Sequence, residues 1–306
     1  MIAYDRKHWF SLMFTVRGTI LPRVRRELVY FFLGTLALCA CHQWLFAVPV
    51  LNSLGHTVMG VTVGMLIVFR NNCSYDRFWE GRKLWGGIIT HSRNLVRTAA
   101  AFASQPVNDL ADLVTAYAHA LKQHLRGKKD LSEIEGMVPA DTYRRVVAAD
   151  NPPTLLAWYI GDWVKQRHVA GQFDAATARA LDNCAAGLID CQSGCERILT
   201  TPLPFAYAVH IRQMLMLYLM TLPLVLLPLM GWFSAPAVAI IVFGLLGIET
   251  VGVEIEDPFG DEANDLHIEA FCAQIRHELQ ATTDAAEARV GGLRLATPEA
   301  PSRRAA

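Results

Sequence analysis

Charged residues are scarce in this sequence, and neither sign is in excess. Asp, Glu, Lys and Arg make up 18% of the 306 residues, whereas hydrophobic residues make up 53%. The 28 basic and 28 acidic side chains cancel, so the chain has no net positive field of the kind that attracts nucleic acid. This composition argues against a nucleic-acid partner and indicates an integral membrane protein.

The motifs of common enzymes and metal sites are also missing. The sequence has no GxxxxGK[ST] phosphate-binding loop, no GxSxG nucleophile elbow and no HExxH zinc motif. Its seven cysteines are odd in number and lack CxxC spacing, which argues against a disulfide framework and a zinc site. We therefore expect neither an enzyme nor a required cofactor.

Long apolar runs are present, and they come in two pairs. The first two runs carry no charged residue, and runs of this kind can cross or line the roughly 30 Å hydrocarbon core of a bilayer as helices. The four runs are Leu28–Leu51, Leu54–Phe69, Phe205–Met230 and Ala235–Val253. Only Arg212 and Glu249 interrupt them, and because an intramembrane charge needs a partner, we hypothesise that these two pair. The sequence predicts four membrane-spanning helices.

Lys and Arg flank each pair of runs but are absent from the short connectors within a pair, so both termini are expected to be cytosolic. The charged N-terminus does not resemble a cleaved signal peptide. We expect a multi-pass protein of the plasma membrane, which in bacteria is the inner membrane. The predicted parts are an N-terminal cytosolic segment (1–27), a transmembrane hairpin (28–69), a cytosolic helical domain (70–200), a second hairpin (201–256), a cytosolic helical segment (257–290) and a disordered tail (291–306).

The second apolar run carries a regular stripe. Val61, Met65 and Phe69 recur at four-residue spacing and share one helix face, and Gly60 and Gly64 would let another backbone approach closely. If several copies surrounded an axis, the stripe would form a narrow apolar collar that gates ions by dewetting. The same spacing also fits an ordinary lipid-facing or core stripe.

Four stretches together resemble the bestrophin family of ion channels, bacterial branch. The segment RNNCSYDRFWEGRKLWGG, which follows Phe69, looks like the family's RxNxxYDRxxEARxxWG signature. Residues 17–20 are similar to a short RGS motif, 196–207 to ERxxxTPxPFAY, and 255–266 to a PFGxDxxDL element. The matches run in the family's order from about residue 10 to residue 280.

The resemblance implies an all-α homopentamer with an axial pore, two transmembrane pairs per subunit and a long cytosolic region. Val61, Met65 and Phe69 fall on the family's pore neck. The family has a second constriction at the cytosolic end, which in this sequence lies around 177–181, and we nominate Leu181 for it.

In animal members, acidic residues after PFG and a main-chain group near the N-terminus hold calcium. Asp257, Glu262 and Asp265 occupy similar positions here, and carboxylates suit Ca²⁺. Ala263 and Asn264, however, stand where the animal proteins have aspartates. Calcium binding is therefore a secondary hypothesis.

The function that we expect is conduction of small monovalent inorganic ions through the collar of a channel whose partners are copies of itself and the lipid bilayer. The collar is uncharged, so cation or chloride selectivity depends on flanking residues, and the match to the bacterial branch slightly favours cations. Two alternatives remain open. One is a secondary transporter that uses Arg212, Glu249 and the histidines His42, His56 and His210, and the other is a membrane-anchored scaffold.

Overall fold

The computed structural model describes Thr15 and residues 18–295. The chain forms two compact units, Met1–Glu80 with Thr200–Leu266 (unit 1) and Gly81–Leu199 with His267–Ala306 (unit 2). Within the described part there is no β-strand, only helices and an isolated bridge between Glu135 and Val138. The predicted all-α fold is confirmed.

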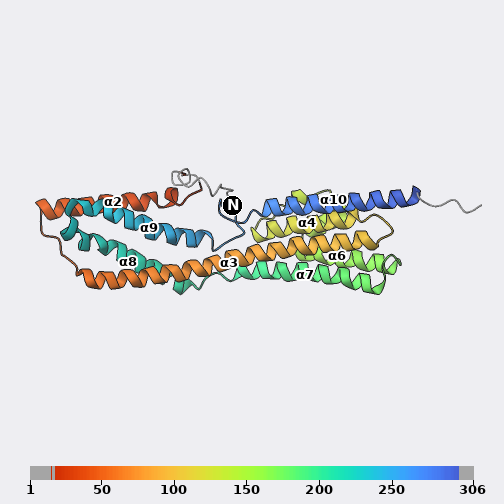
Figure 1. Ribbon diagram of the computed structural model, residues 1–306, viewed down its shortest axis with the longest axis horizontal. Coiled ribbons are helices and arrows are strands. Elements are labelled where there is room, and N and C mark those ends of the chain that lie inside the picture. Colours follow the sequence, from red (N-terminus) through yellow and green to blue (C-terminus); the bar gives the residue numbers. More distant parts are fainter. Residues whose placement is uncertain (1–14, 16–17, 296–306) are drawn as a thin grey trace, which may run out of the picture. The chain divides into compact units, whose positions relative to one another are not determined.

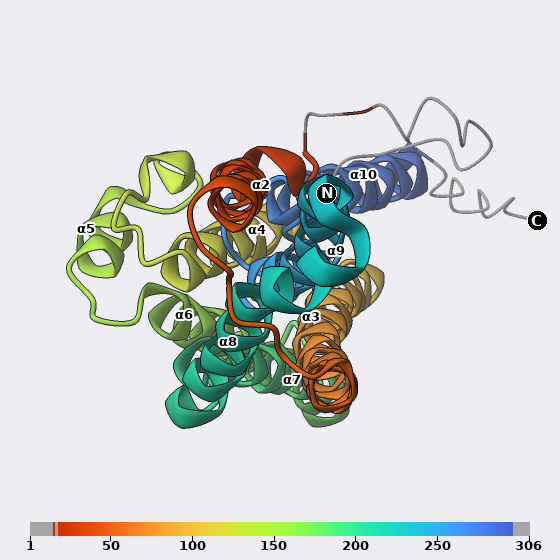
Figure 2. The ribbon, with the colours of Figure 1, turned by 90° about the vertical axis from the view of Figure 1, so that its left-hand side faces the viewer.

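Most of the α-helices are labelled in Figure 1, and α5 is labelled in Figure 2. They are α2 Leu21–Trp44, α3 Ser53–Phe102, α4 Asn108–Leu125, α5 Ala140–Val147, α6 Pro152–Val169, α7 Ala175–Thr200, α8 Phe205–Met230, α9 Ser234–Glu254 and α10 Ile268–Leu295, with short 3-10 turns at Ser132–Ile134 and Gly231–Phe233.

Unit 1 is built from α2, the first part of α3, α8 and α9. Figure 1 shows α2 running alongside α9, and α8 connects to α9 through the Gly231–Phe233 turn. Gly231 has a φ of 51°, a left-handed value that suits glycine at this tight turn. The core of the unit consists of Val24, Val63, Ile67, Ile211, Leu215, Leu219, Leu222, Val238, Val242 and Leu246. Aliphatic side chains from all four helices therefore pack together.

The apolar runs and the helices do not coincide at their ends. The first predicted span reaches Leu51, but α2 ends at Trp44, and the Val48 amide then donates to Nδ1 of His42 at 3.1 Å. The second run was expected to end at Arg70, but α3 continues as a single 50-residue helix. In the described part, α3 and the stretch Phe205–Glu254 are long and apolar enough to cross a membrane.

Unit 2 packs the rest of α3 with α4, α6, α7 and α10, and Figure 2 shows α5 next to α6. Its core is centred on α4, where Leu110, Val114, Tyr117 and Leu121 have no exposed surface. Helices α3 and α7 approach closely, because a Cβ atom at Gly87 would lie 2.6 Å from the Cys191 sulfur. Residues 291–295, which the prediction assigned to the tail, belong to α10; the rest of the predicted tail, residues 296–306, lies outside the described part.

Candidate functional site

The stripe on α3 lies on the face that unit 1 leaves open. Val61, Met65 and Phe69 are 61%, 55% and 56% exposed. On the opposite face of the same turns, Val63 and Ile67 are buried in the unit's core. A helix that is apolar on both faces, with one face uncovered, is suited to contact lipid, a second copy of the chain or a dewetted passage.

The two glycines beside the stripe have different surroundings. A Cβ atom at Gly60 would lie 3.0 Å from the Tyr218 hydroxyl of α8, whereas one at Gly64 would meet nothing within 4 Å. Tyr218 also stacks on His56, with 4.3 Å between ring centroids, and His56 Nε2 lies 3.2 Å from the Tyr218 carbonyl oxygen. Gly60 therefore accommodates a tyrosine ring inside the unit, and only Gly64 leaves room for an outside partner.

A charged network holds α3 to α8 and α9. Glu249 Oε1 accepts hydrogen bonds from Arg70 Nη1 at 2.5 Å and from Arg212 Nε at 3.1 Å. Arg70 Nη2 also lies 3.6 Å from Glu256 Oε2, and the Arg70 side chain is only 2% exposed. The predicted pairing of Arg212 with Glu249 is confirmed. Arg70, the more deeply buried partner, was missed, although its position directly after Phe69 places it on the other face of α3.

Next to this network, Arg77 holds the chain that leads into α8. Its Nε donates to the Glu256 carbonyl at 3.0 Å and its Nη1 to the Thr201 carbonyl at 2.5 Å. The Leu203 amide donates to the Glu256 carboxylate at 3.2 Å. These contacts join three of the sequence stretches quoted above: 70–87, 196–207 and 255–266.

Leu181, nominated for a second constriction, lies on α7 with 0% exposure. A constriction requires side chains on a surface of the subunit, and Leu181 instead packs inside unit 2. Its burial argues against the nominated role, which we do not carry forward.

The three carboxylates of the calcium hypothesis already have partners inside unit 1. Asp257 Oδ1 accepts from the Phe259 amide at 3.2 Å, Glu262 pairs with Arg23 at 2.7 Å, and Asp265 Oδ2 accepts from the Glu262 amide at 2.7 Å. Burial raises the pKa of Asp265, and the nearby carboxylates of Glu262 and Asp257 add to this rise. Among the described residues, no group of three or more His, Cys, Asp or Glu is placed to hold a metal ion.

The side-chain amide of Asn264 lies next to these carboxylates in the sequence. Asn264 Nδ2 donates to the Gly18 carbonyl at 3.4 Å and to Glu254 Oε1 at 3.0 Å. Two oxygen atoms of unit 1, the Gly18 carbonyl and one Glu254 carboxylate oxygen, are therefore hydrogen-bonded to this neutral side chain. Calcium binding by these residues stays an untested prediction.

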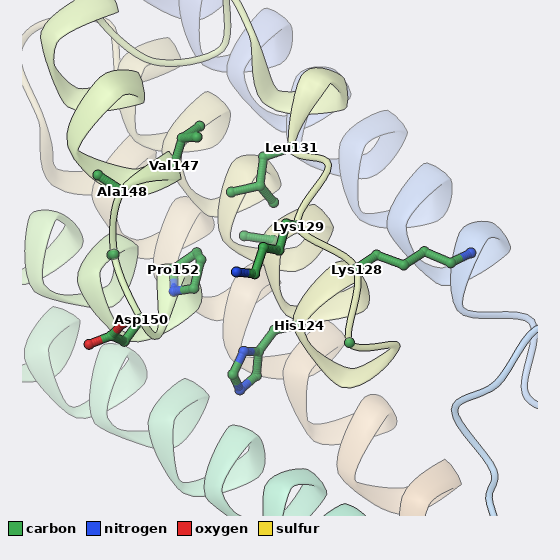
Figure 3. A pocket seen from close by; sticks show the side chains of 11 residues that line it. His124, Lys128, Lys129, Leu131, Val147, Ala148, Asp150 and Pro152 are labelled. Atoms are coloured by element: carbon green, nitrogen blue, oxygen red, sulfur yellow. The ribbon is translucent and has the colours of Figure 1, made fainter.

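Unit 2 contains a cavity of about 360 Å³ lined by His124, Lys128, Lys129, Val147 and Asp150, among others. Figure 3 shows Lys128 and Lys129 extending in opposite directions, so that their charges do not converge. His124 Nε2 lies 3.2 Å from Glu196 Oε1. No residue predicted from the sequence to be functional lines this cavity.

Comparison with known proteins agrees with this arrangement. The model of the bacterial and fungal bestrophin family matches residues 1–281. The chain belongs to the bestrophin family. Among its bestrophin-family relatives, a Nostoc protein named voltage-dependent anion channel-forming protein is 34% identical over 286 residues, covering 91% of this chain and 92% of the relative. The protein of that name from Escherichia coli K12, YneE, is 29% identical over 290 residues, covering 94% and 95%.

Solved bestrophin structures share the fold. A crystal structure of a bacterial bestrophin homolog from Klebsiella pneumoniae superposes with a TM-score of 0.80 at 26% identity, covering 85% of this chain and 98% of that one. The resemblance inferred from the four sequence stretches is confirmed, and the family extends over both units.

Proposed function

We propose that this bestrophin is the subunit of an ion channel, in which five copies surround an axial pore that passes small monovalent ions. The observation that carries the proposal is the uncovered stripe Val61, Met65 and Phe69, whose helix is buried in the unit on its other face. In a ring of subunits with these stripes facing the axis, three layers of apolar side chains would form the pore neck.

Such a neck would act through hydration. An ion between apolar side chains loses water contacts and gains no replacement ligands, so the closed neck is a barrier that widening or wetting removes. The Arg70–Glu249 contact supports this role, because it anchors α3 one residue after Phe69 and on the side away from the stripe.

The proposed membrane arrangement has four crossings per subunit: α2, the first part of α3, α8 and α9. The first turns of α2 carry Arg23, Arg25 and Arg26, which supports a cytosolic start of this helix in the inner membrane. A channel that assembles from copies of itself needs no other protein partner.

The names of the relatives bear on the charge sign of the conducted ion. The curated relatives are named anion channel-forming proteins, which favours chloride and other anions and runs against the slight preference for cations drawn from the sequence. The collar itself is apolar and offers no charge with which to choose.

Truncation of the collar tests the proposed neck. We expect the triple variant Val61→Ala, Met65→Ala, Phe69→Ala to raise single-channel conductance in planar bilayers, because a wider and more easily wetted neck lowers the barrier. Met220→Ala is the matched control, since Met220 is 66% exposed on α8 and lies off the stripe.

Unchanged conductance in the triple variant would contradict the assignment of these three residues to the pore neck. Flux that saturates with ion concentration would instead indicate a transporter, and the absence of any flux from folded protein would indicate a membrane-anchored scaffold.

A further inference from the structure

The exposed stripe on α3 does not end at Phe69. At spacings of three and then four residues it continues through Asn72 and Asp76, both of which are exposed. Positions spaced in this way stay on one face of an α-helix. The apolar stripe of Val61, Met65 and Phe69 is thus followed, on the same face and still within unit 1, by an amide and then a carboxylate.

Asp76 has no counter-ion among the residues that the structure describes. It forms no hydrogen bond or ion pair with any residue that the structure describes. Its neighbours one turn away on α3 are Asn72, Cys73, Trp79 and Glu80, none of which is basic. The adjacent Arg77 directs its guanidinium to the Thr201 and Glu256 carbonyls. No basic side chain therefore lies one turn from Asp76 on this face of α3; the next one along the face, the exposed Lys83, follows seven residues later.

We infer that Asp76 sets the charge preference of the pore by forming a ring of carboxylates at one end of the neck that favours cations over anions. The inference rests on the proposed channel, in which the stripe faces the axis. Repeating one unpaired carboxylate around an axis concentrates negative potential in the passage, which raises the local concentration of cations and opposes anions. The collar would then act as the gate, and Asp76 as the residue that selects the charge.

The cation preference inferred from Asp76 differs from the relatives' names. A channel that carries such a ring should prefer K⁺ or Na⁺ to Cl⁻, whereas the relatives are named anion channel-forming proteins. The preference should be strongest at low salt, because mobile ions screen a water-exposed carboxylate over a Debye length of about 10 Å at 0.1 M and about 3 Å at 1 M.

The test is the reversal potential of the full-length protein in planar bilayers under a KCl gradient. We expect the native channel to reverse near the K⁺ equilibrium potential. In Asp76→Asn, the ratio of K⁺ to Cl⁻ permeability should fall on the order of tenfold, and Asp76→Lys should move the reversal toward the Cl⁻ potential. Asp76→Glu, which keeps the charge, should behave like the native channel.

Glu27→Gln is the matched control, because Glu27 is an exposed carboxylate of the same unit on α2. It should leave the reversal potential unchanged. The native protein provides a second measurement that needs no variant: its cation preference should weaken between 0.1 M and 1 M KCl.

The outcomes separate the inference from the channel itself. Native currents whose reversal is the same in Asp76→Asn, or is independent of salt, would overturn the role of Asp76 and leave the channel standing. Equal shifts in Asp76→Asn and Glu27→Gln would also overturn it, because they would indicate general surface charge. No current from folded native protein would overturn the channel and this inference together.

Discussion

Phe69 and Arg70 are neighbours in the chain, but their side chains leave α3 on different faces. Phe69 is 56% exposed, whereas Arg70 is 2% exposed and is bound to Glu249. Because successive residues on a helix point about 100° apart, one turn can present an apolar side chain outward and anchor itself with a buried ion pair. The position of the stripe therefore depends on a charge that lies behind it.

Removing the acidic partner should destabilise unit 1. We expect Glu249→Gln to lower the free energy of unfolding by up to about 3–5 kcal/mol, because it leaves the buried Arg70 with only the more distant Glu256. Arg212→Gln, which breaks the exposed side of the same network, should cost no more than about 1 kcal/mol. Thermal unfolding in detergent would compare the two variants, and equal losses would show that Arg70 does not depend on Glu249.

At the scale of the element, α3 is a single helix from Ser53 to Phe102, although its composition changes from apolar to charged at Arg70. A change in polarity alters which surroundings a helix prefers, but it does not interrupt the backbone hydrogen bonds that continue the helix. The sequence contains no proline between Ser53 and Phe102 that would break it.

Gly60 and Gly64 of α3 provide a matched pair of variants. Gly60→Leu should reduce the stability of the protein by about 1–3 kcal/mol, because the new side chain would collide with the Tyr218 ring. No atom of the subunit lies within 4 Å of a Cβ atom at Gly64, so Gly64→Leu should leave the helical content of the subunit unchanged. The larger side chain should instead weaken contacts between copies. Circular dichroism and native mass spectrometry would measure the two effects, and an intact oligomer in Gly64→Leu would place Gly64 outside any subunit contact.

At the scale of the whole molecule, ion pairs with low carboxylate pKa values are concentrated in unit 2. A hydrogen bond from Arg126 lowers the pKa of Glu269, and one from Arg93 lowers that of Glu278. Partial burial tends to raise the pKa of Glu133, but its bonds to Lys122 and His119 outweigh this and lower it. All three carboxylates stabilise the folded chain in their ionised form.

Acid should therefore destabilise unit 2. A carboxylate with a lowered folded-state pKa contributes stability above its unfolded pKa, about 4.3 for Glu, and loses it as the pH falls through the folded value. We expect the melting temperature of the full chain to fall below about pH 5, and Glu269→Gln to flatten this dependence. Melting curves from pH 7 to pH 3 would measure it.

Asp112 provides a control, because its pKa is shifted in the opposite direction. Partial burial raises its pKa, and the charge of Arg276 only partly offsets this. Its protonation therefore favours the folded state, so Asp112→Asn should stabilise the protein at neutral pH. A lower melting temperature for Asp112→Asn at pH 7 would contradict this assignment.

Local patterns in the sequence determined much of this protein. The apolar runs, the stripe of Val61, Met65 and Phe69, and the four bestrophin-like stretches depend on residues a few positions apart, so they can be read without coordinates. They were sufficient for the all-α fold, the bestrophin family and the pairing of Arg212 with Glu249, whose charges are the only ones in the second hairpin's apolar runs. The ends of the helices were less predictable, because polarity alone does not decide where a helix begins or stops.

Tertiary structure decided the rest. Arg70 and Glu249 are 179 positions apart, and only the packing of α3 against α9 brings them to 2.5 Å. Packing also buries Leu181 and leaves Asp76 exposed, without a counter-ion in the described part of the chain, although both lie in charged, helical sequence. Which face of a helix is covered depends on neighbours that are distant in the chain, so the sequence alone could name the stripe but not the charge that follows it on the open face.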